Sequence, residues 1–170
     1  MKLSSVLAAV GIASTAVIAA TVDIPARAQG APVPQDASVG IQKAHIYPPI
    51  DTAAADIKAA LAEAQRSHKR VIVDFGGDWC PDCQVLNIYF HQSPNADLLA
   101  KYFVRVNVNV GRMDANKEIA EGYGVPLKGV PALAVLDGSG KVVYAQNREF
   151  ADMRHLDSAA LTAFLNQWKP

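Results

Sequence analysis

The chain has 170 residues, of which 51% are apolar, so we expect a single domain with a substantial core. Its 16 Lys and Arg residues balance 16 Asp and Glu residues. This balance gives no electrostatic reason to expect nucleic acid or a strongly acidic surface as a partner.

Residues 1–28 have the layout of a secretory signal peptide. Lys2 precedes an apolar run over residues 3–20, and Ala26 and Ala28 form a small-residue cleavage pattern. The alternative is an uncleaved membrane anchor, because the apolar run is nearly long enough to span a bilayer. Export to an oxidising compartment would place the protein where disulfides persist.

Residues 29–50 contain four prolines and no clear periodicity. This composition predicts a linker or a loosely packed N-terminal arm. The folded domain is then expected to cover residues 51–170.

Periodic patterns in this domain predict the order helix, strand, helix, strand, helix, strand, strand, helix. Apolar residues at helical spacing predict helices over residues 51–70, after Cys80, over 114–124 and over 157–168, with a further turn or two at 95–102. Short β-branched runs predict strands at 71–75, 103–110, 132–136 and 141–145. Alternating helices and strands imply parallel pairing, and the closing hairpin adds an antiparallel pair. We therefore expect an α/β fold in which helices cover both faces of a mixed central sheet.

The chain has 2 cysteines, Cys80 and Cys83, and they lie where the apolar strand at 71–75 gives way to a helix. Backbone N–H groups at a helix N-terminus favour negative charge, so we expect a stabilised thiolate and a lowered pKa for Cys80. Cys83, one turn later on the same side, can attack a mixed disulfide held on Cys80. Cys80 is therefore the predicted nucleophile of thiol–disulfide exchange, and Cys83 is the predicted resolving thiol.

Three other interpretations of the cysteine pair stay open. A structural zinc site would need about four N or S ligands, and the histidines that could complete it show no paired spacing: His45, His68, His91 and His155. A purely structural disulfide would stabilise weakly, because it closes a very short loop. The third interpretation is a binding module in which the pair is vestigial.

Two segments resemble known signatures. The stretch VDFGGDWCPDC, residues 73–83, resembles the active-site segment of thioredoxins, and YGVPLKGVPALAVLDGSGKVV, residues 123–143, resembles their second signature. The resemblance covers residues 51–170 in element order and implies a thioredoxin-like fold with protein-disulfide oxidoreductase activity. The inner pair Pro-Asp differs from the Gly-Pro usual in thioredoxins and is similar to the W-C-P-D-C of a smaller related group. The export signal resembles that of bacterial periplasmic members.

The resemblance also implies roles for single residues. Trp79 would shield the site on one side. Pro131 would be a cis proline facing the disulfide, and Val130 would offer backbone hydrogen bonds to an extended substrate. Pro126 is the weaker candidate for the cis proline, because Val130-Pro131 runs directly into the next strand. A Pro-Leu-Lys insertion makes this loop longer than in a simple thioredoxin.

Asp74 is the acidic residue of the strand that precedes the cysteines. A carboxylate on a buried strand is costly to ionise, and Asp74 could exchange a proton with Cys83 as the mixed disulfide resolves. The alternative is that the Asp74 side chain reaches solvent or a lysine at the sheet edge.

Pro81 and Asp82 lie between the cysteines and are expected to tune their redox chemistry. The charge of Asp82 opposes thiolate formation at Cys80, which makes the pair a weaker oxidant and favours a reductase or isomerase-type role. The alternative is that Asp82 extends into water, where its charge is screened.

Taken together, these patterns predict an exported thiol–disulfide oxidoreductase that acts on protein disulfides or thiols. It needs no organic cofactor or metal, and an upstream thiol-transfer protein would supply its electrons. We expect a monomer without nucleic-acid partners. The lack of a third cysteine excludes a disulfide-linked dimer that keeps the active pair intact, but not other oligomers. The alternatives are an oxidase that donates its disulfide and a non-catalytic binding or metal-handling module.

Overall fold

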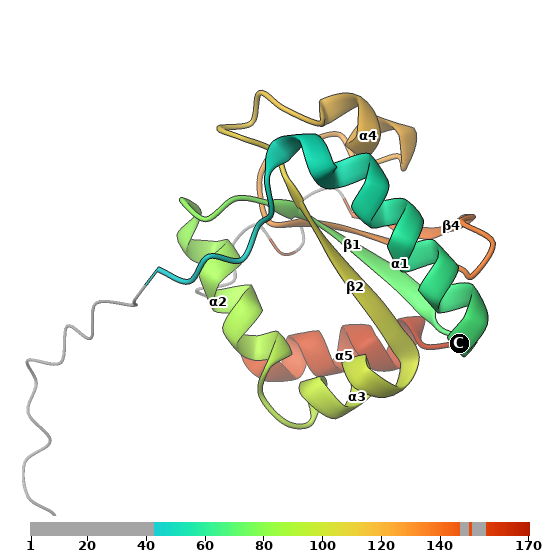
Figure 1. The fold of residues 1–170 in the computed structure, drawn as a ribbon. Coiled ribbons are helices and arrows are strands. Elements are labelled where there is room, and N and C mark those ends of the chain that lie inside the picture. Colours follow the sequence, from blue (N-terminus) through green and yellow to red (C-terminus); the bar gives the residue numbers. More distant parts are fainter. Residues whose placement is uncertain (1–42, 147–149, 151–155) are drawn as a thin grey trace, which may run out of the picture. The chain divides into compact units, whose positions relative to one another are not determined.

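The computed structural model describes residues 43–146, 150 and 156–170. Figure 1 shows the elements in chain order. They are η1 (Ile50–Thr52), α1 (Ala53–Ser67), β1 (Arg70–Gly76), α2 (Pro81–Phe90), α3 (Asn95–Tyr102), β2 (Phe103–Asn109), α4 (Lys117–Gly122), β3 (Ala132–Leu136), β4 (Val142–Ala145) and α5 (Ser158–Trp168). The predicted order of helices and strands is confirmed. The helix expected over 114–124 is shorter, because α4 covers only 117–122.

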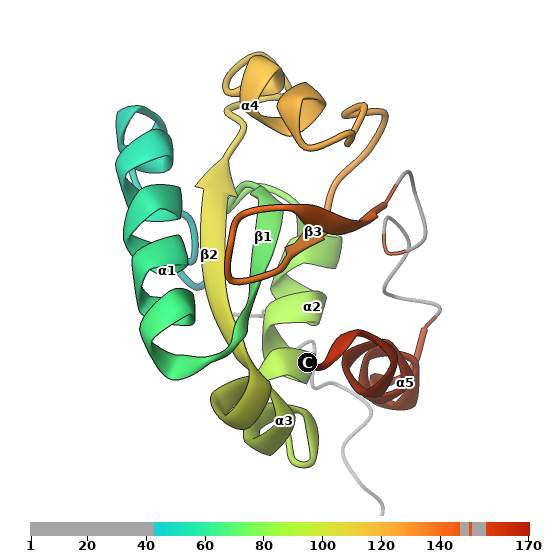
Figure 2. The ribbon, with the colours of Figure 1, turned by 90° about the vertical axis from the view of Figure 1, so that its right-hand side faces the viewer.

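The strands form a mixed sheet in the order β2-β1-β3-β4. β1 runs parallel to β2 and antiparallel to β3, and β3 pairs with β4 as the predicted hairpin. Figure 2 shows α1 on one side of the sheet and α2 and α5 on the other. The α/β fold with helices on both faces of a mixed central sheet is therefore confirmed.

The side chains of β1 point alternately to the two faces of the sheet and contribute to an apolar cluster on each face. On the α1 face, Val71, Val73 and Phe75 join a cluster with Ala60 and Ala64 of α1. On the other face, Ile72 joins a second cluster with residues of α2 and α5, including Leu86, Phe90, Leu161 and Leu165. β1 is buried along nearly its whole length, as expected for a central strand covered on both faces.

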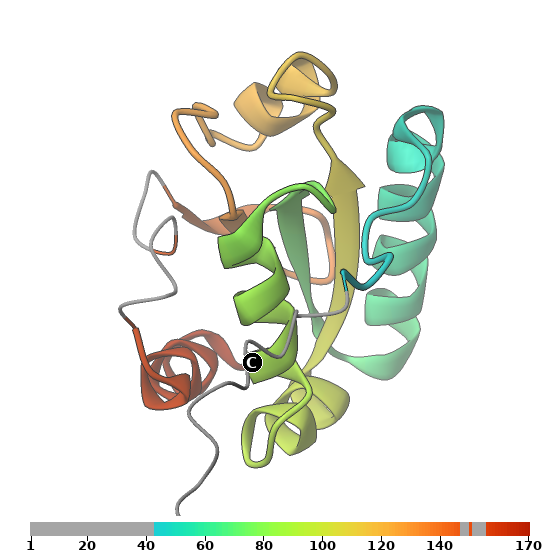
Figure 3. The same cartoon turned by 90° about the vertical axis from the view of Figure 1, so that its left-hand side faces the viewer.

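β2 is an edge strand, and its alternation separates an apolar side from a polar one. Val104, Val106 and Val108 lie with the α1 cluster. Polar residues alternate with these valines: Arg105, Asn107 and Asn109. The two carboxamides hold the chain segment that precedes η1, since Asn107 Nδ2 donates to Ile46 O at 2.9 Å and Asn109 Nδ2 donates to Pro48 O at 3.0 Å. We call this segment, residues 43–49, the strap; Figure 3 shows it in cyan as it leads into α1 beside β2.

The strap is the described end of the segment 29–50, for which we expected loose packing. Its Tyr47 is 0% exposed, and polar side chains from β2 and α2 hold its backbone. The strap is thus packed rather than loose. The signal peptide expected at residues 1–28 lies outside the described residues, as does the rest of the expected arm. No helix in the described part of the chain is long and apolar enough to cross a membrane.

Candidate active site

Cys80 and Cys83 form a disulfide at the N-terminus of α2. Cys80 is the N-cap residue, and its Sγ accepts a hydrogen bond from the Cys83 N–H at 3.1 Å. Pro81 occupies the first helical turn, where the absent N–H costs nothing. Cys80 is 3% exposed and Cys83 is 0% exposed. The cysteines therefore lie where a helix N-terminus stabilises negative charge, as the sequence predicts, with Cys83 on the inner side.

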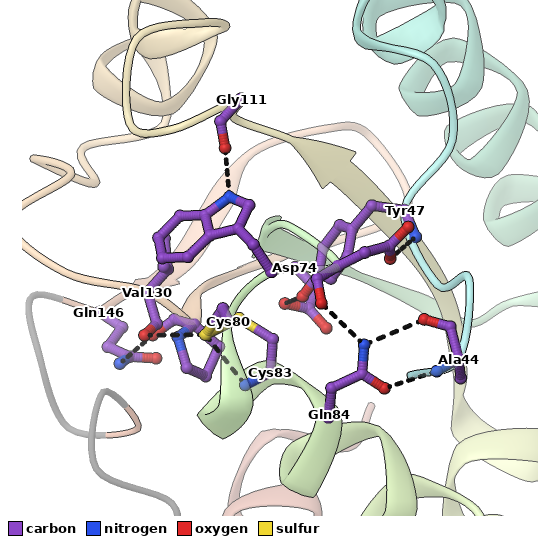
Figure 4. Close-up of a disulfide and its surroundings, with 12 residues drawn as sticks. Ala44, Tyr47, Asp74, Cys80, Cys83, Gln84, Gly111, Val130 and Gln146 are labelled. Atoms are coloured by element: carbon purple, nitrogen blue, oxygen red, sulfur yellow. Dashed lines mark hydrogen bonds between the residues drawn. A yellow bond between two sulfur atoms is a disulfide. The ribbon is translucent and has the colours of Figure 1, made fainter. Parts of the chain in front are cut away.

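The strand register brings the second signature to the disulfide. Phe75 near the end of β1 pairs with Ala132 at the start of antiparallel β3, so the residues just before β3 lie beside the loop that carries Cys80. The Val130-Pro131 peptide bond is cis, as the resemblance implies. The carbonyl oxygen of Val130 lies 3.5 Å from Cys80 Sγ. Figure 4 shows the two groups facing each other.

Gln146 holds the backbone around the start of β3, next to the cis proline. Its side chain is 0% exposed, its Oε1 accepts from the Leu133 N–H at 3.0 Å, and its Nε2 donates to Pro131 O at 3.5 Å. The carboxamide thereby fixes the backbone on both sides of the β3 entry. Gln146 was not among the predicted site residues, because a glutamine just after a hairpin strand gives no local signal that it will bind the backbone of Leu133 and Pro131.

Trp79 is half-buried beside the cysteine pair. Its indole N–H donates to the carbonyl oxygen of Gly111, in the loop after β2. The guanidinium carbon of Arg112 lies 5.3 Å from the centroid of the Trp79 ring, which is a cation–π distance. Trp79 is thus held against the loop that follows β2, and the shielding role expected for it stays a prediction.

Asp74 is 0% exposed and faces α2 rather than α1. Its Oδ2 accepts two hydrogen bonds from Arg105 of β2, from Nη2 at 2.7 Å and from Nε at 3.2 Å. Its Oδ1 accepts from the Tyr47 hydroxyl at 3.0 Å. The alternative that Asp74 reaches solvent or a lysine is therefore wrong, because its cationic partner is a neighbouring arginine inside the protein.

Arg105 is itself well enclosed, with a side chain that is 9% exposed. Its Nη1 donates to Asn87 Oδ1 at 2.9 Å, and its guanidinium carbon lies 4.3 Å from the centroid of the Phe90 ring. Buried charges persist in proteins when they are paired and hydrogen-bonded, which is the case for Arg105 and Asp74. An arginine among the polar positions of β2 was the available sequence signal for this pair.

Asp82 lies in the first turn of α2 and is only 9% exposed. The alternative in which it extends into water is therefore wrong. A charge in such a buried position would be screened less than one in water, and the redox-tuning role expected for Asp82 stays a prediction.

The strap contacts the loop before Cys80 through Asp78. Asp78 Oδ1 accepts from the backbone N–H groups of Ile46 at 2.8 Å and Tyr47 at 3.0 Å, and Oδ2 lies 2.6 Å from His45 Nδ1. Burial raises the pKa of the Asp78 carboxyl, but these donors outweigh burial and hold that pKa below its ordinary value of 3.8. Asp78 therefore ties the strap to the active-site loop as a carboxylate.

Gln84 on α2 forms the second tie to the strap. Its Nε2 donates to Ala44 O at 3.0 Å, and its Oε1 accepts from the Ala44 N–H at 3.1 Å, a paired contact seen in Figure 4. A pocket of about 240 Å³ lies between the strap and the active-site loop, lined by Lys43, Asp78, Trp79, Pro81 and Gln84. Three of these residues belong to the loop or the first turn that carries Cys80.

Within the described residues, no group of three or more His, Cys, Asp or Glu side chains is placed to hold a metal ion. His155, one of the histidines considered for a zinc site, lies outside them. Asp74, buried near the disulfide, is engaged with Arg105.

The family model described as Thioredoxin-like matches residues 52–138, about half of the chain. The chain belongs to the thioredoxin-like family. Among solved structures, it is similar to a disulphide isomerase from Xylella fastidiosa, with 32% identity, a TM-score of 0.69, and coverage of 73% of this chain and 96% of that one. A thioredoxin from Thermus thermophilus is 26% identical, with a TM-score of 0.51 and coverage of 74% and 86%.

The thioredoxin-like chain is also 25% identical over 128 residues to the thiol:disulfide interchange protein DsbD of Klebsiella pneumoniae. That match covers 75% of this chain and 20% of the relative, so the chain spans about a fifth of that protein's length. The family and the Cys80–Cys83 pair at a helix start together support thiol–disulfide oxidoreductase activity.

Proposed function

We propose that the protein reduces disulfide bonds in exported proteins by dithiol exchange through Cys80 and Cys83. The observation that carries this proposal is the disulfide at the N-terminus of α2 with the Val130 carbonyl 3.5 Å from Cys80 Sγ. An extended substrate can pair with the backbone beside the cis proline and present its own sulfur to Cys80. The pocket beside Trp79 gives room for a neighbouring substrate side chain.

The reaction begins with the reduced protein. The Cys80 thiolate attacks a substrate disulfide, a Cys80–substrate disulfide forms, and the other substrate sulfur leaves as a thiolate that takes a proton from water. Cys83 then attacks Cys80 Sγ, which restores the intramolecular disulfide and releases the second substrate sulfur. Two electrons have moved from the protein to the substrate, and an upstream dithiol protein must return them.

Asp74 would accept the proton that Cys83 loses in the second step. Tyr47 shares an apolar cluster with both cysteines, and its hydroxyl donates to the Asp74 carboxylate. A Cβ on Gly76 would meet both the Tyr47 hydroxyl and Cys83 Sγ, which supports an acceptor on the Cys83 side of the disulfide. Because Asp74 is 0% exposed, water does not compete for this proton.

The direction of electron flow depends on how strongly the Cys80 thiolate is stabilised. The buried charge of Asp82 opposes this thiolate, which makes the reduced form less favoured and the pair a better reductant. Replacement of Asp82 by Asn should lower the Cys80 pKa and raise the reduction potential. An unchanged or higher Cys80 pKa in D82N, measured from thiolate absorbance, would contradict the reductase assignment.

The proposed setting is the periplasm, after cleavage of residues 1–28. Its support is the apolar N-terminal run in the sequence and the similarity to a thiol:disulfide interchange protein. We propose that a membrane-associated thiol-transfer protein donates the electrons and that the chain acts as a monomer.

The test is covalent trapping. Reduced Cys83→Ser protein, mixed with a disulfide-containing protein such as insulin, should accumulate a mixed disulfide that a non-reducing gel resolves and a thiol reductant releases. Cys80→Ser should trap nothing and should not reduce the insulin disulfides. Equal trapping by both variants, or none by either, would overturn the proposal.

Disulfide isomerisation is a second candidate, because the Xylella fastidiosa structure that is 32% identical is a disulphide isomerase. An isomerase restores activity to a scrambled, disulfide-containing enzyme without net reduction. Recovery of that activity at catalytic amounts of the protein, with the substrate thiol count unchanged, would favour isomerisation over reduction.

A further inference from the structure

Tyr47 reaches the inner side of the disulfide from the strap. Its side chain is 0% exposed, it packs against both cysteines, and its hydroxyl donates to Asp74 Oδ1 at 3.0 Å. Figure 4 shows Tyr47 and Asp74 beside the sulfur atoms. A residue outside every helix and strand thus contacts the reacting pair and the proposed proton acceptor at once.

Gly76 leaves the space that Tyr47 occupies. A Cβ on Gly76 would overlap the Tyr47 hydroxyl and would lie 2.9 Å from Cys83 Sγ. Both atoms therefore approach the same point above the Gly76 backbone. The hydroxyl that binds Asp74 consequently lies next to the resolving sulfur, and any side chain at position 76 would separate them.

The strap holds Tyr47 in this position from three sides. Its backbone N–H donates to Asp78 in the active-site loop, Gln84 of α2 pairs with Ala44, and Asn107 of β2 holds Ile46. Because the Tyr47 side chain is already buried and its backbone is anchored, it loses little further conformational entropy when the Asp74 carboxylate gains or loses a proton. The hydroxyl is a fixed donor rather than a mobile one.

We propose that Tyr47 is a positioning residue for the second chemical step: its hydroxyl holds the Asp74 carboxylate in place and in its charged form, ready to accept the Cys83 proton. This inference rests on the proposed dithiol mechanism. In the step, the proton of the Cys83 thiol moves to Asp74, a bond forms between Cys83 Sγ and Cys80 Sγ, and the bond from Cys80 to the substrate breaks. The electron pair leaves on the substrate sulfur, which is protonated by water.

The charges around Tyr47 agree with a donor role. Burial, followed by the nearby charge of Asp74, raises the pKa of Tyr47 well above its ordinary value of 10.0, so the hydroxyl keeps its proton throughout the working pH range. Arg105 of β2 holds the other oxygen of Asp74, and Asp78 lies on the strap side. Asp82 is the acidic residue that α2 contributes at its first turn.

The experiment compares Tyr47→Phe with the wild-type protein and with Tyr89→Phe. Tyr89 lies on the same active-site helix, and its hydroxyl donates to the Leu156 carbonyl at 2.9 Å rather than to Asp74. Each reduced protein is mixed with a chromogenic aromatic disulfide. The rate of mixed-disulfide formation and the rate of its resolution by Cys83 are measured by stopped flow from pH 4 to pH 10, a range of about six units.

Loss of the Tyr47 hydroxyl removes a hydrogen bond to the charged carboxylate. The acid limb of the resolution rate should therefore move to higher pH by about one unit, while the attack by Cys80 keeps its profile. Tyr89→Phe should match the wild type in both steps. In an Asp74→Asn background, Tyr47→Phe should cause no further shift, because the carboxylate it holds is gone.

Coincident resolution profiles for Tyr47→Phe, Tyr89→Phe and wild type would overturn the inference while leaving the exchange mechanism intact. Failure of the wild type to resolve any mixed disulfide would instead overturn the proposed function. Thermal unfolding checks that each variant is folded. If Tyr47→Phe does not fold, Asp78→Asn replaces it, because the loss of the Asp78 carboxylate loosens the strap at Tyr47 and should give a smaller shift in the same direction; no shift would contradict the inference.

Discussion

The two faces of β1 differ in kind. Toward α1 the strand presents only apolar side chains, all 0% exposed: Val71, Val73 and Phe75. Toward α2 it presents the apolar Ile72 and the buried carboxylate of Asp74. The third position on this face is Gly76, which Tyr47 of the strap and Cys83 approach closely. The first face stabilises the fold by burying apolar side chains. The second face has fewer apolar contacts, because it holds the Asp74 carboxylate near the sulfur of Cys83.

The two faces of β1 should therefore tolerate different substitutions. On the α1 face, a smaller side chain leaves a cavity, and the cost is lost transfer free energy and lost contacts. On the α2 face, removal of one partner leaves the other buried and unmatched in charge, which costs more than the pair contributes. Variants on the first face should change stability alone, and variants on the second should also change redox behaviour.

The largest expected effect comes from Arg105→Met. It leaves the Asp74 carboxylate, 0% exposed, without its cation, so the free energy of unfolding should fall by about 3–5 kcal/mol. Urea unfolding at neutral pH measures this loss. The control is Arg66→Met, whose side chain is 74% exposed beside Glu63 and should cost less than about 1 kcal/mol. Equal costs for the two variants would contradict the account of the Asp74–Arg105 pair.

Leu136→Ala probes the apolar face. Leu136 is 0% exposed in the α1 cluster, so its truncation should cost about 2–5 kcal/mol of unfolding free energy. The reduction potential of the cysteine pair should stay unchanged, because no polar contact near the sulfurs is lost. Ile88→Ala on α2, a side chain 41% exposed, should leave stability within about 0.5 kcal/mol. A potential that shifts with Leu136→Ala would break the division between the faces.

Gly76→Ala tests how closely Tyr47 and Cys83 pack against the α2 face of β1. The added methyl group would overlap the Tyr47 hydroxyl and crowd Cys83, so we expect a loss of about 1–3 kcal/mol and slower resolution by Cys83. Gly122→Ala is the matched control, because nothing lies within 4 Å of a Cβ at that position. The control in helix α4 should be neutral or stabilising by up to about 1 kcal/mol. Similar melting temperatures for the two variants would show that position 76 has room for a side chain.

The smallest expected effect is a pH dependence at Asp78. Its pKa is lowered in the folded state, so its contribution to stability is present above the unfolded value and is lost as the pH falls below 3.8 toward the folded value. The stability difference between the wild type and Asp78→Asn should therefore shrink across that acidic range. Chemical unfolding at a series of pH values measures it. A difference that stays constant down to the acid limit would argue against Asp78 as a charged tie to the strap.

The α1 face was predictable from sequence, and much of the α2 face was not. The apolar residues of β1, the alternation of β2 and the helical spacing of α1 are local patterns, and each led to the observed element. The two cysteines at a strand-to-helix junction were equally local. These features required no knowledge of contacts between distant segments.

Tyr47 and Arg105 depended on such contacts. Tyr47 lies next to Pro48 in a segment without periodicity, so its complete burial came only from long-range ties to α2 and β2. Arg105 is a charged residue within β2. Its position in the sequence does not reveal that Asp74 lies on the adjacent strand β1 and on the same face of the sheet. Gly76 permits close backbone approach, but its place in the sequence does not reveal that Tyr47 and Cys83 approach it.

The reduction potential of the Cys80–Cys83 pair distinguishes a reductant from an oxidant. The protein is equilibrated with defined thiol buffers, and the fluorescence of Trp79 beside the disulfide reports the oxidised fraction. We predict a value near about −270 mV, typical of a reductant such as thioredoxin. A value near about −120 mV would identify an oxidant and contradict the role assigned to Asp82, and a pair that forms no reversible disulfide would contradict the proposed function itself.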